Sequence, residues 1–457
     1  MTRLPGYEAR RLRSLAEQHL WMPYSPPGAQ GTVRDEIRVM THGRGVRTWD
    51  AEGNEYLDGT SALEALILGH GDEEIVEAIA QQARTMSFVD VFRFVAPPQV
   101  ELAAELVAAS PGMAMAHFTP GGAEADEVAI KMARQYHALR GEPYRMKVIT
   151  RQGAFHGVTA GAMALDGQYF ASRNVVYDGG LSWGRTVPAG ACPACDFGKA
   201  SRYLACVHAI EATIEAEGPE TVAAVVVDPC ATAIGVSIPP VGYLRDLRAV
   251  CDRHGVLLVV DEIITGMGRT GRLFATEWDA IRPDFITLSK ALSSGYVPIG
   301  ATLVSPVIRD IFLERGGVFL HGHTYAGHPV AAAAALTVLR RVIRERLPER
   351  AAELGARLLE GLRSLDHHRS YWDARGKGLL AGLEIVRDNG TGEDFADRLA
   401  AGNALRVAAR ERGLTTLLLH PGNVLFVAPA VVASEADIDR MVAILDDALG
   451  DVEAAWT

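Results

Sequence analysis

Three short apolar runs that lie close together in the second half of the chain constrain its fold most strongly. The first, residues 256–260, contains only Val and Leu, which is typical of a strand buried on both faces, and it leads directly into Asp261. The second, residues 285–288, is followed within two residues by Lys290, and the third is residues 299–304. Ligands of parallel α/β sheets bind just beyond the carboxyl ends of the strands. A carboxylate and a lysine are therefore predicted to meet at one edge of such a sheet.

This pair of side chains suits one kind of chemistry. A lysine beside a buried apolar strand end gives up its proton easily, as a lysine that forms a Schiff base must. A carboxylate in the same crevice can pair with the protonated pyridine nitrogen of a cofactor. The alternative is that Asp261 and Lys290 are ordinary solvated charges at strand ends, and the two residues alone leave both interpretations open.

The residues around the pair resemble the class III aminotransferases, which use pyridoxal phosphate (PLP). The string DEIITGMGRTG, starting at Asp261, is followed by TLSKALSSGYVPIGA, which contains Lys290, and the resemblance extends over most of the chain. It implies an α/β fold of the PLP-dependent transferase (aspartate aminotransferase-like) type. The mainly parallel, doubly wound large domain would be residues 61–325, and a smaller α/β domain would combine residues 1–60 and 326–457.

The resemblance also implies roles for the residues around the cofactor ring. Lys290 would hold PLP covalently and, once the substrate releases it, would move a proton between the substrate carbon and the cofactor. Asp261 would keep the pyridine nitrogen protonated. Four further residues would surround the ring, with Phe155 and Ile263 on its two faces and His156 and Asp228 beside it.

A glycine pair before a predicted helix is the candidate phosphate site. Gly121 and Gly122 would let the helix present free backbone N–H groups to an anion. The segment resembles the family's Ser-Gly-Ser-Glu-Ala-Asn motif, but Gly121 and Ala123 replace the serines and Asp126 replaces the asparagine. Thr324 matches the family threonine that reaches the PLP phosphate of the neighbouring subunit, which implies a homodimer with shared active sites.

Four residues are predicted to face the substrate. The resemblance implies that Trp21 and Tyr24 wall the pocket. Phe426 stands where many relatives that bind an α-carboxylate have an arginine, and a bidentate arginine is the usual partner of a carboxylate. We therefore expect a neutral or cationic primary amine, such as an amino sugar or aminoglycoside. The alternative is an epimerase or isomerase on the same scaffold, with Cys230 as a second acid or base.

Composition narrows the remaining function classes. A formal net charge of −11 disfavours nucleic acid as a partner, and no apolar run is long enough to cross a membrane. The first residues lack a secretory signal, and five cysteines suggest reduced thiols, so we expect a cytoplasmic protein. Cys192, Cys195, Cys206 and His208 are poorly spaced for a structural zinc site, and no metal is predicted.

Overall fold

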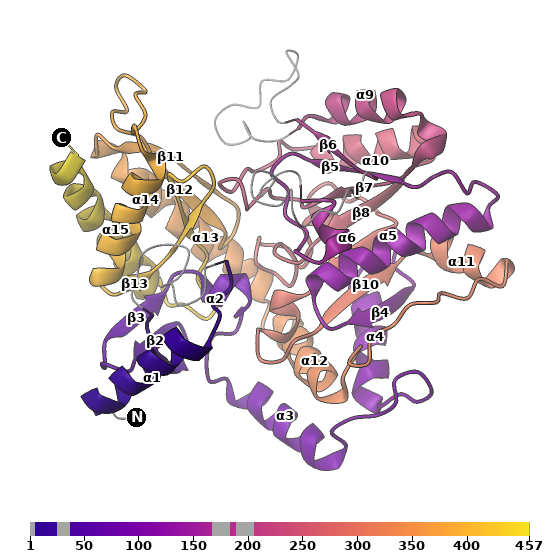
Figure 1. The fold of residues 1–457 in the computed structure, drawn as a ribbon, viewed down its shortest axis with the longest axis horizontal. Helices are drawn as coiled ribbons and strands as arrows, with labels where there is room; N and C mark the ends of the chain where they lie inside the picture. The colour runs from indigo at the N-terminus through magenta and orange to yellow at the C-terminus, as the bar shows by residue number, and fades with distance from the viewer. Residues whose placement is uncertain (1–4, 25–36, 167–182, 189–204, 457) are drawn as a thin grey trace.

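The computed structural model describes residues 5–24, 37–166, 183–188 and 205–456. They form two lobes, and both ends of the chain lie in the same lobe (Figure 1). That lobe holds two four-stranded sheets, and the other lobe holds a seven-stranded sheet. The α/β class predicted from the sequence is confirmed.

The seven-stranded sheet has the strand order β4-β10-β9-β8-β7-β5-β6. The strands are β4 (Met115–Thr119), β5 (Lys147–Arg151), β6 (Gly184–Val187), β7 (Val222–Val227), β8 (Leu257–Asp261), β9 (Phe285–Leu288) and β10 (Gly300–Val304). Strands β6, β5, β7, β8 and β9 are parallel to one another, whereas β10 is antiparallel to both β4 and β9. Strand β10, the third apolar run, therefore begins at the edge of the sheet where β8 and β9 end. Its first residue, Gly300, lies at that edge.

Helices cover both faces of this sheet, which explains the unbroken apolar runs in its central strands. Alternate residues of a strand point to opposite faces. Val225 and Leu258 pack with α9 (Val207–Glu217) and α10 (Tyr243–His254). Val226 and Val259 pack on the other side, with α5 (Gly122–Leu139) and α11 (Pro306–Glu314).

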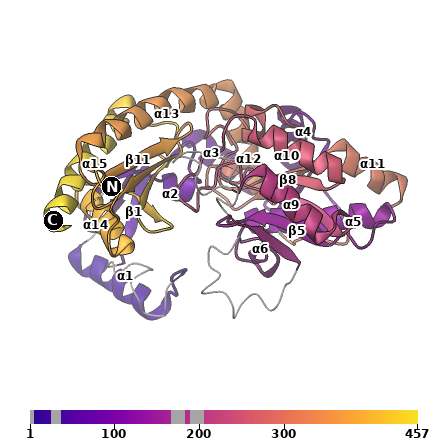
Figure 2. The ribbon, with the colours of Figure 1, turned by 90° about the horizontal axis from the view of Figure 1, so that it is seen from above.

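The second lobe joins the two ends of the chain. Strand β3 of the N-terminal part pairs in parallel with β13 of the C-terminal part. One sheet contains β1 (Met40–Arg44), β2 (Arg47–Asp50), β3 (Glu55–Asp58) and β13 (Leu414–Thr415), and the other contains β11 (Tyr371–Gly376), β12 (Ala381–Ile385), β14 (Leu417–Leu419) and β15 (Val424–Val427). Helices α13 (Leu347–Arg363), α14 (Arg398–Glu411) and α15 (Glu435–Trp456) surround these sheets (Figure 2).

The remaining helices connect or flank the lobes. They are α1 (Gly6–His19), α2 (Ser61–Glu64), α3 (Glu73–Thr85), α4 (Pro97–Ala109), α6 (Ala160–Met163) and α12 (Pro329–Arg344), with 3₁₀ turns at Pro219–Thr221, Ala275–Trp278, Lys290–Ser293 and Ser364–His367. Helix α12 packs against α3 and α4, which both fall in the proposed large domain, so the boundary near residue 326 stays a prediction. Among the described helices, none combines the length and the apolar character that a membrane span requires.

Candidate active site

A cavity of about 180 Å³ lies beyond the carboxyl ends of β7, β8 and β9. Most of the residues predicted to hold PLP line it, together with one predicted substrate residue: Gly122, Ala123, Phe155, His156, Asp228, Cys230, Asp261, Ile263 and Lys290. Parallel strands ending at a common edge bring these side chains together from distant parts of the sequence. Gly121 is the N-cap residue of α5, directly beside this set.

Asp261 and His156 form a buried pair in this cavity. The Nδ1 atom of His156 lies 2.7 Å from Oδ2 of Asp261, and the backbone N–H of Ile263 donates to Oδ1 of Asp261 at 2.9 Å. Burial alone would lower the pKa of His156, but the hydrogen bond and charge of Asp261 outweigh burial, and the pKa is raised. A protonated His156 stabilises negative charge on Asp261, the form that a protonated pyridine nitrogen requires as its partner.

A third titratable group, Asp126, touches this pair from α5. Its side chain is fully buried, accepts a hydrogen bond from the Thr287 hydroxyl at 2.7 Å, and lies with His156 and Asp261 in a cluster whose ligand atoms are within 4.8 Å of one another. Burial raises the pKa of Asp126 well above its ordinary value, and the Asp261 charge raises it further. Burial thus favours the protonated, uncharged form of Asp126, which would resemble the neutral asparagine that the family has at this position.

Lys290 stands on the opposite wall at the end of β9. Its φ is 43°, in the left-handed region that non-glycine residues rarely adopt, and such backbone strain is concentrated at functional sites. Its Nζ atom lies 2.5 Å from Oε2 of Glu64, on the turn named α2. Glu64 was not predicted from the sequence. The available signal was one acidic residue inside an otherwise apolar run, ALEALIL, from residue 62 to residue 68.

The N-terminus of α5 forms the third side of the cavity. The helix starts at Gly122, the second glycine of the predicted pair, and its first turn has backbone N–H groups without partners inside the helix. A Cβ atom on Gly122 would lie 2.7 Å from Cδ1 of Ile263, so the start of the helix packs closely against the Ile263 side chain. The described chain thus retains backbone donors for a phosphate where the family's serine hydroxyls are absent.

Asp228 and Cys230 complete the cavity beyond β7. Arg151, buried behind them, donates to both the carbonyl and the carboxylate of Asp228. Burial raises the pKa of Asp228, although the charge of Arg151 opposes this effect. Burial also raises the pKa of the Cys230 thiol, so Cys230 is a neutral SH group and not a ready base.

Four of the predicted residues lie away from this cavity. The prediction for Phe426 needs correction: its side chain is fully buried in an apolar cluster with Val236, Leu380 and Cys230, behind the cavity wall, because β15 points it into the core. Trp21 and Tyr24 are exposed, and among the described residues neither lines the cavity. Thr324 is also exposed and is not among the described residues that line the cavity. Cys192 and Cys195 lie outside the described residues, whereas Cys206 caps α9 by accepting from the backbone N–H of Ala209.

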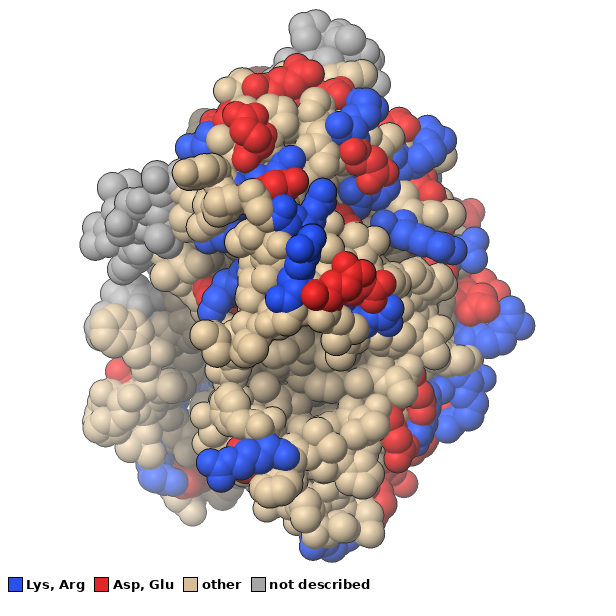
Figure 3. Space-filling view, turned by 90° about the vertical axis from the view of Figure 1, so that its right-hand side faces the viewer, with Lys and Arg blue, Asp and Glu red and all other residues tan. Residues whose placement is uncertain are grey.

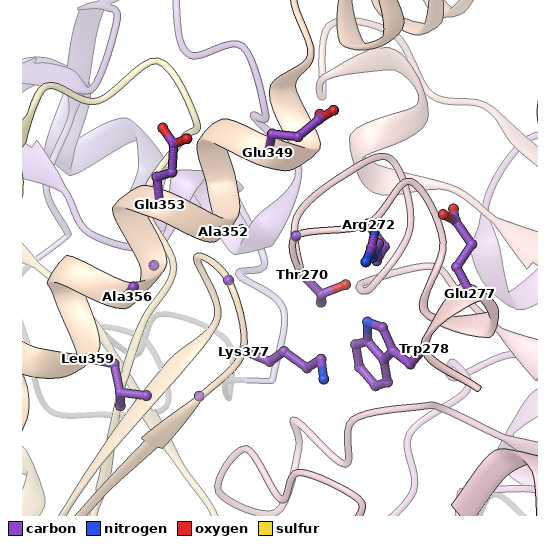
Figure 4. A pocket seen from close by; sticks show the side chains of 14 residues that line it. Thr270, Arg272, Glu277, Trp278, Glu349, Ala352, Glu353, Ala356, Leu359 and Lys377 are labelled. Atoms are coloured by element: carbon purple, nitrogen blue, oxygen red, sulfur yellow. The ribbon is translucent and has the colours of Figure 1, made fainter. Parts of the chain in front are cut away.

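A second cavity is larger, at about 660 Å³, and lies between α13 and the loop around residue 272 (Figure 4). Lys377 points toward Trp278, with its Nζ atom 4.3 Å from the ring centroid. The carboxylates of Glu349 and Glu353 point away from Lys377. None of the residues predicted for the cofactor lines this cavity, so chemistry, not size, identifies the smaller cavity as the active site.

The fold and the lysine–carboxylate cavity are those of a PLP-dependent transferase. The family profile for class III aminotransferases matches residues 30–449. The chain is 33% identical over 466 residues to putrescine–pyruvate aminotransferase of Pseudomonas aeruginosa, covering 99% of each protein. It is 34% identical over 438 residues to taurine–pyruvate aminotransferase of Bilophila wadsworthia, covering 92% of this chain and 93% of that protein.

A solved structure gives the same result. The omega transaminase from Pseudomonas jessenii in complex with PMP matches with a TM-score of 0.89 and 30% identity, over 97% of this chain and 99% of that chain. The chain belongs to the class III aminotransferases and is a PLP-dependent aminotransferase. The residues present fit PLP, because a carboxylate, a lysine and a helix N-terminus face one cavity.

Proposed function

We propose that this cavity is the catalytic site of an aminotransferase for a neutral or cationic primary amine. The observation that carries the proposal is the convergence of Lys290, the Asp261–His156 pair and the N-terminus of α5 on one cavity. Lys290 would hold the cofactor and Asp261 would pair with its ring nitrogen. Phe155 and Ile263 would contact the ring faces, and Gly122 and Ala123 would bind the phosphate.

Each of these groups has a physical task. When bound, PLP supplies an aldehyde that captures amines and a ring that accepts electrons. The Nζ atom of Lys290, once free, would take a proton from the amine-bearing carbon of the substrate and deliver it to the cofactor on the same face. Asp261 holds the proton on the ring nitrogen, and His156 keeps Asp261 oriented through their 2.7 Å contact. The buried walls exclude water from the reacting atoms.

The charges around the cavity support the choice of substrate class. Asp228 lines the cavity and Glu64 touches Lys290, whereas none of the described residues that line the cavity is an arginine. A substrate carboxylate there would lack a buried partner, which is costly, but an ammonium group would find one. An amino sugar or aminoglycoside fits this requirement, and putrescine, the substrate in the name of one relative, is also a cationic amine.

The epimerase alternative rested on Cys230 as a second acid or base. Cys230 does line the cavity, but burial raises its pKa and leaves it a neutral thiol. A carbanion approached from that side would meet no ready proton acceptor. These observations favour amino transfer over epimerisation.

A homodimer with shared sites is part of the same proposal. Apolar side chains with exposures above 60% gather in two adjacent segments: Phe92, Phe94, Val95, Val318, Leu320 and Tyr325. The segments touch, since Phe88 and Tyr325 have ring centroids 5.8 Å apart. On this side of the molecule, charged side chains crowd the upper half and leave much of the lower half uncharged (Figure 3). A second copy of the chain would cover this exposed apolar face. In such a dimer, Thr324 of each copy would reach the cofactor phosphate in the other copy.

An amine screen tests the proposed function directly. The purified, PLP-loaded protein is mixed with amino sugars, polyamines, simple monoamines and α-amino acids at equal concentration, and the absorbance change from the aldehyde to the amine form of the cofactor is followed. We expect conversion with neutral or cationic amines and release of the matching carbonyl compound. A strong preference for α-amino acids contradicts the substrate class, and deuterium uptake without loss of the amino group supports an epimerase instead.

A further inference from the structure

The turn that carries Glu64 has a strained backbone. Ser61, Ala62, Leu63 and Glu64 have φ values of 44°, 48°, 63° and 61°, so four successive residues with side chains lie in the left-handed region. Each such residue is unfavourable for an L-amino acid, and the strain persists only where the surrounding structure enforces it. This turn therefore holds the Glu64 side chain in one place.

Arg269 enforces the conformation of the turn. Its guanidinium is fully buried and donates to the Ser61 hydroxyl at 2.9 Å and to the Glu64 carbonyl at 3.4 Å. The Ser61 hydroxyl donates in turn to the Ala428 carbonyl at 2.7 Å, which ties the turn to the second lobe. Arg269 uses its donors on backbone and hydroxyl oxygens, so it positions Glu64 without hydrogen-bonding its carboxylate.

In the described part of the chain, the Glu64 carboxylate has one cationic hydrogen-bond partner, Lys290. The Glu64 side chain is 6% exposed, and Nζ of Lys290 lies 2.5 Å from Oε2. The proposed function requires the Lys290 nitrogen to move away from Glu64 when it bonds the cofactor. A buried carboxylate without a donor is costly, and the vacated position is open to another ammonium group.

We propose that Glu64 binds a second ammonium group of the substrate, so that the enzyme selects amines that carry another positive charge, such as diamines. The proposal rests on the proposed function, since it requires Lys290 to leave Glu64. It assigns the selection to a strained turn from the N-terminal half of the chain, not to the predicted residues Trp21, Tyr24 or Phe426. A charge-assisted contact of this kind favours the doubly charged substrate by about tenfold to a hundredfold.

The test compares putrescine with butylamine, which lacks one terminal ammonium group. The kcat/KM of each amine is measured with the PLP-loaded wild type, Glu64→Gln, Glu64→Asp and, as a matched control in the larger cavity (Figure 4), Glu353→Gln. We expect the wild type to prefer putrescine by at least about tenfold. Glu64→Gln should lose this preference, mainly through a higher KM for putrescine, whereas Glu64→Asp should keep part of it and Glu353→Gln all of it.

A binding measurement supplements the rates. Putrescine methylated twice on each nitrogen has no primary amine, cannot react with the cofactor aldehyde, and should inhibit the wild type at least about tenfold more strongly than Glu64→Gln. An unchanged preference in Glu64→Gln, or an equal fall in kcat for both amines, overturns the proposal and leaves Glu64 as a partner of Lys290 alone. If Glu64→Gln fails to fold, two other measurements test the proposal. They are the ratio of kcat/KM for putrescine and butylamine with Glu64→Asp, and the inhibition of the wild type by methylated putrescine. A wild type that converts neither amine also overturns the selection of diamines, whereas the proposed function fails only if the whole amine screen gives no conversion.

Discussion

At the scale of single residues, the site is a set of charges held out of water. Asp261 lies close to His156 and Asp126, whose pKa values are both raised, and Lys290 lies on the other wall against Glu64. Low exposure strengthens each of these interactions, since little water screens them. The charge on each residue and the residue that bonds the cofactor therefore decide activity.

Replacing Lys290 with alanine should abolish the covalent bond between protein and cofactor. Lys290 supplies the amine that lines the cavity in the described chain, and its neighbours in the sequence are apolar or carry hydroxyl groups. Borohydride reduction followed by mass measurement of the intact protein checks this outcome. If the Lys290→Ala protein still gains the mass of reduced cofactor at one site, another residue forms the bond.

Asparagine substitutions at Asp261 and Asp126 should reduce activity to very different extents. Asp261→Asn should retain PLP but lose about a hundredfold or more in kcat, because the ring nitrogen loses its charged partner. Asp126→Asn should cost much less activity, because burial already favours the uncharged form of Asp126. The measurement is kcat with a reactive amine, together with the pH profile of cofactor absorbance. Equal losses in both variants would show that Asp126 carries charge as well.

At the scale of elements, strand ends and one helix start build the site. Strands β7, β8 and β9 deliver Asp228, Asp261 and Lys290 to one edge, and α5 begins opposite them. The antiparallel strand β10 passes behind the start of α5. Its first residue, Gly300, has so little space that a Cβ atom would lie 2.3 Å from the carbonyl oxygen of Gly121.

Gly300→Ala should therefore weaken cofactor binding and lower the melting temperature. The added methyl group meets backbone, which cannot move without displacing the phosphate turn, and such overpacking typically costs about 1–3 kcal/mol. Gly450→Ala is the matched control, because nothing lies within 4 Å of a Cβ atom there and alanine favours the helix. Thermal unfolding and PLP titration of both variants give the answer. A Gly300→Ala protein as stable as Gly450→Ala contradicts the packing argument.

At the scale of the whole molecule, one buried acid makes stability depend on pH. Glu262 is almost fully buried, and burial raises its pKa to about 7 from the ordinary 4.5. Because the folded state then holds a proton that the unfolded state has lost, stability should fall as pH rises from about 4.5 to about 7. Against Glu262→Gln, the wild type should lose about 3 kcal/mol across this window. Urea unfolding at several pH values measures the difference, and parallel curves for the two proteins would disprove the assignment.

The proposed homodimer makes a second prediction at this scale. In solution the protein should have twice the 49.1 kDa mass of the chain. Leu320→Glu, at a residue that is 88% exposed on the apolar face, should shift the equilibrium toward monomer and reduce activity. Val241→Glu is the control, since Val241 is 98% exposed but lies before α10, in a different part of the chain. Sedimentation of the three proteins separates these outcomes, and a monomeric wild type would refute the proposal.

Much of this molecule follows from local sequence patterns. Continuous Val and Leu runs predict strands covered on both faces, and the polar residues that end them predict a site at the strand ends, because strand direction puts those ends together. The helix start at Gly121 and Gly122 was also predictable, since a glycine turn before a helix is a short-range feature. The family assignment depended on such motifs and was confirmed.

What only the tertiary structure decided were contacts between distant residues. Glu64 and Lys290 are far apart in the sequence, so their 2.5 Å contact could not be predicted from local patterns. The left-handed turn from Ser61 to Glu64 contains no glycine, so nothing in the sequence signalled it. The alternation of β15 directs Phe426 into the core, which sequence similarity to an arginine position did not reveal. The raised pKa of Asp126 likewise arises from burial beside Asp261. Local patterns specify elements, whereas burial, charge state and cross-chain contacts depend on how those elements pack.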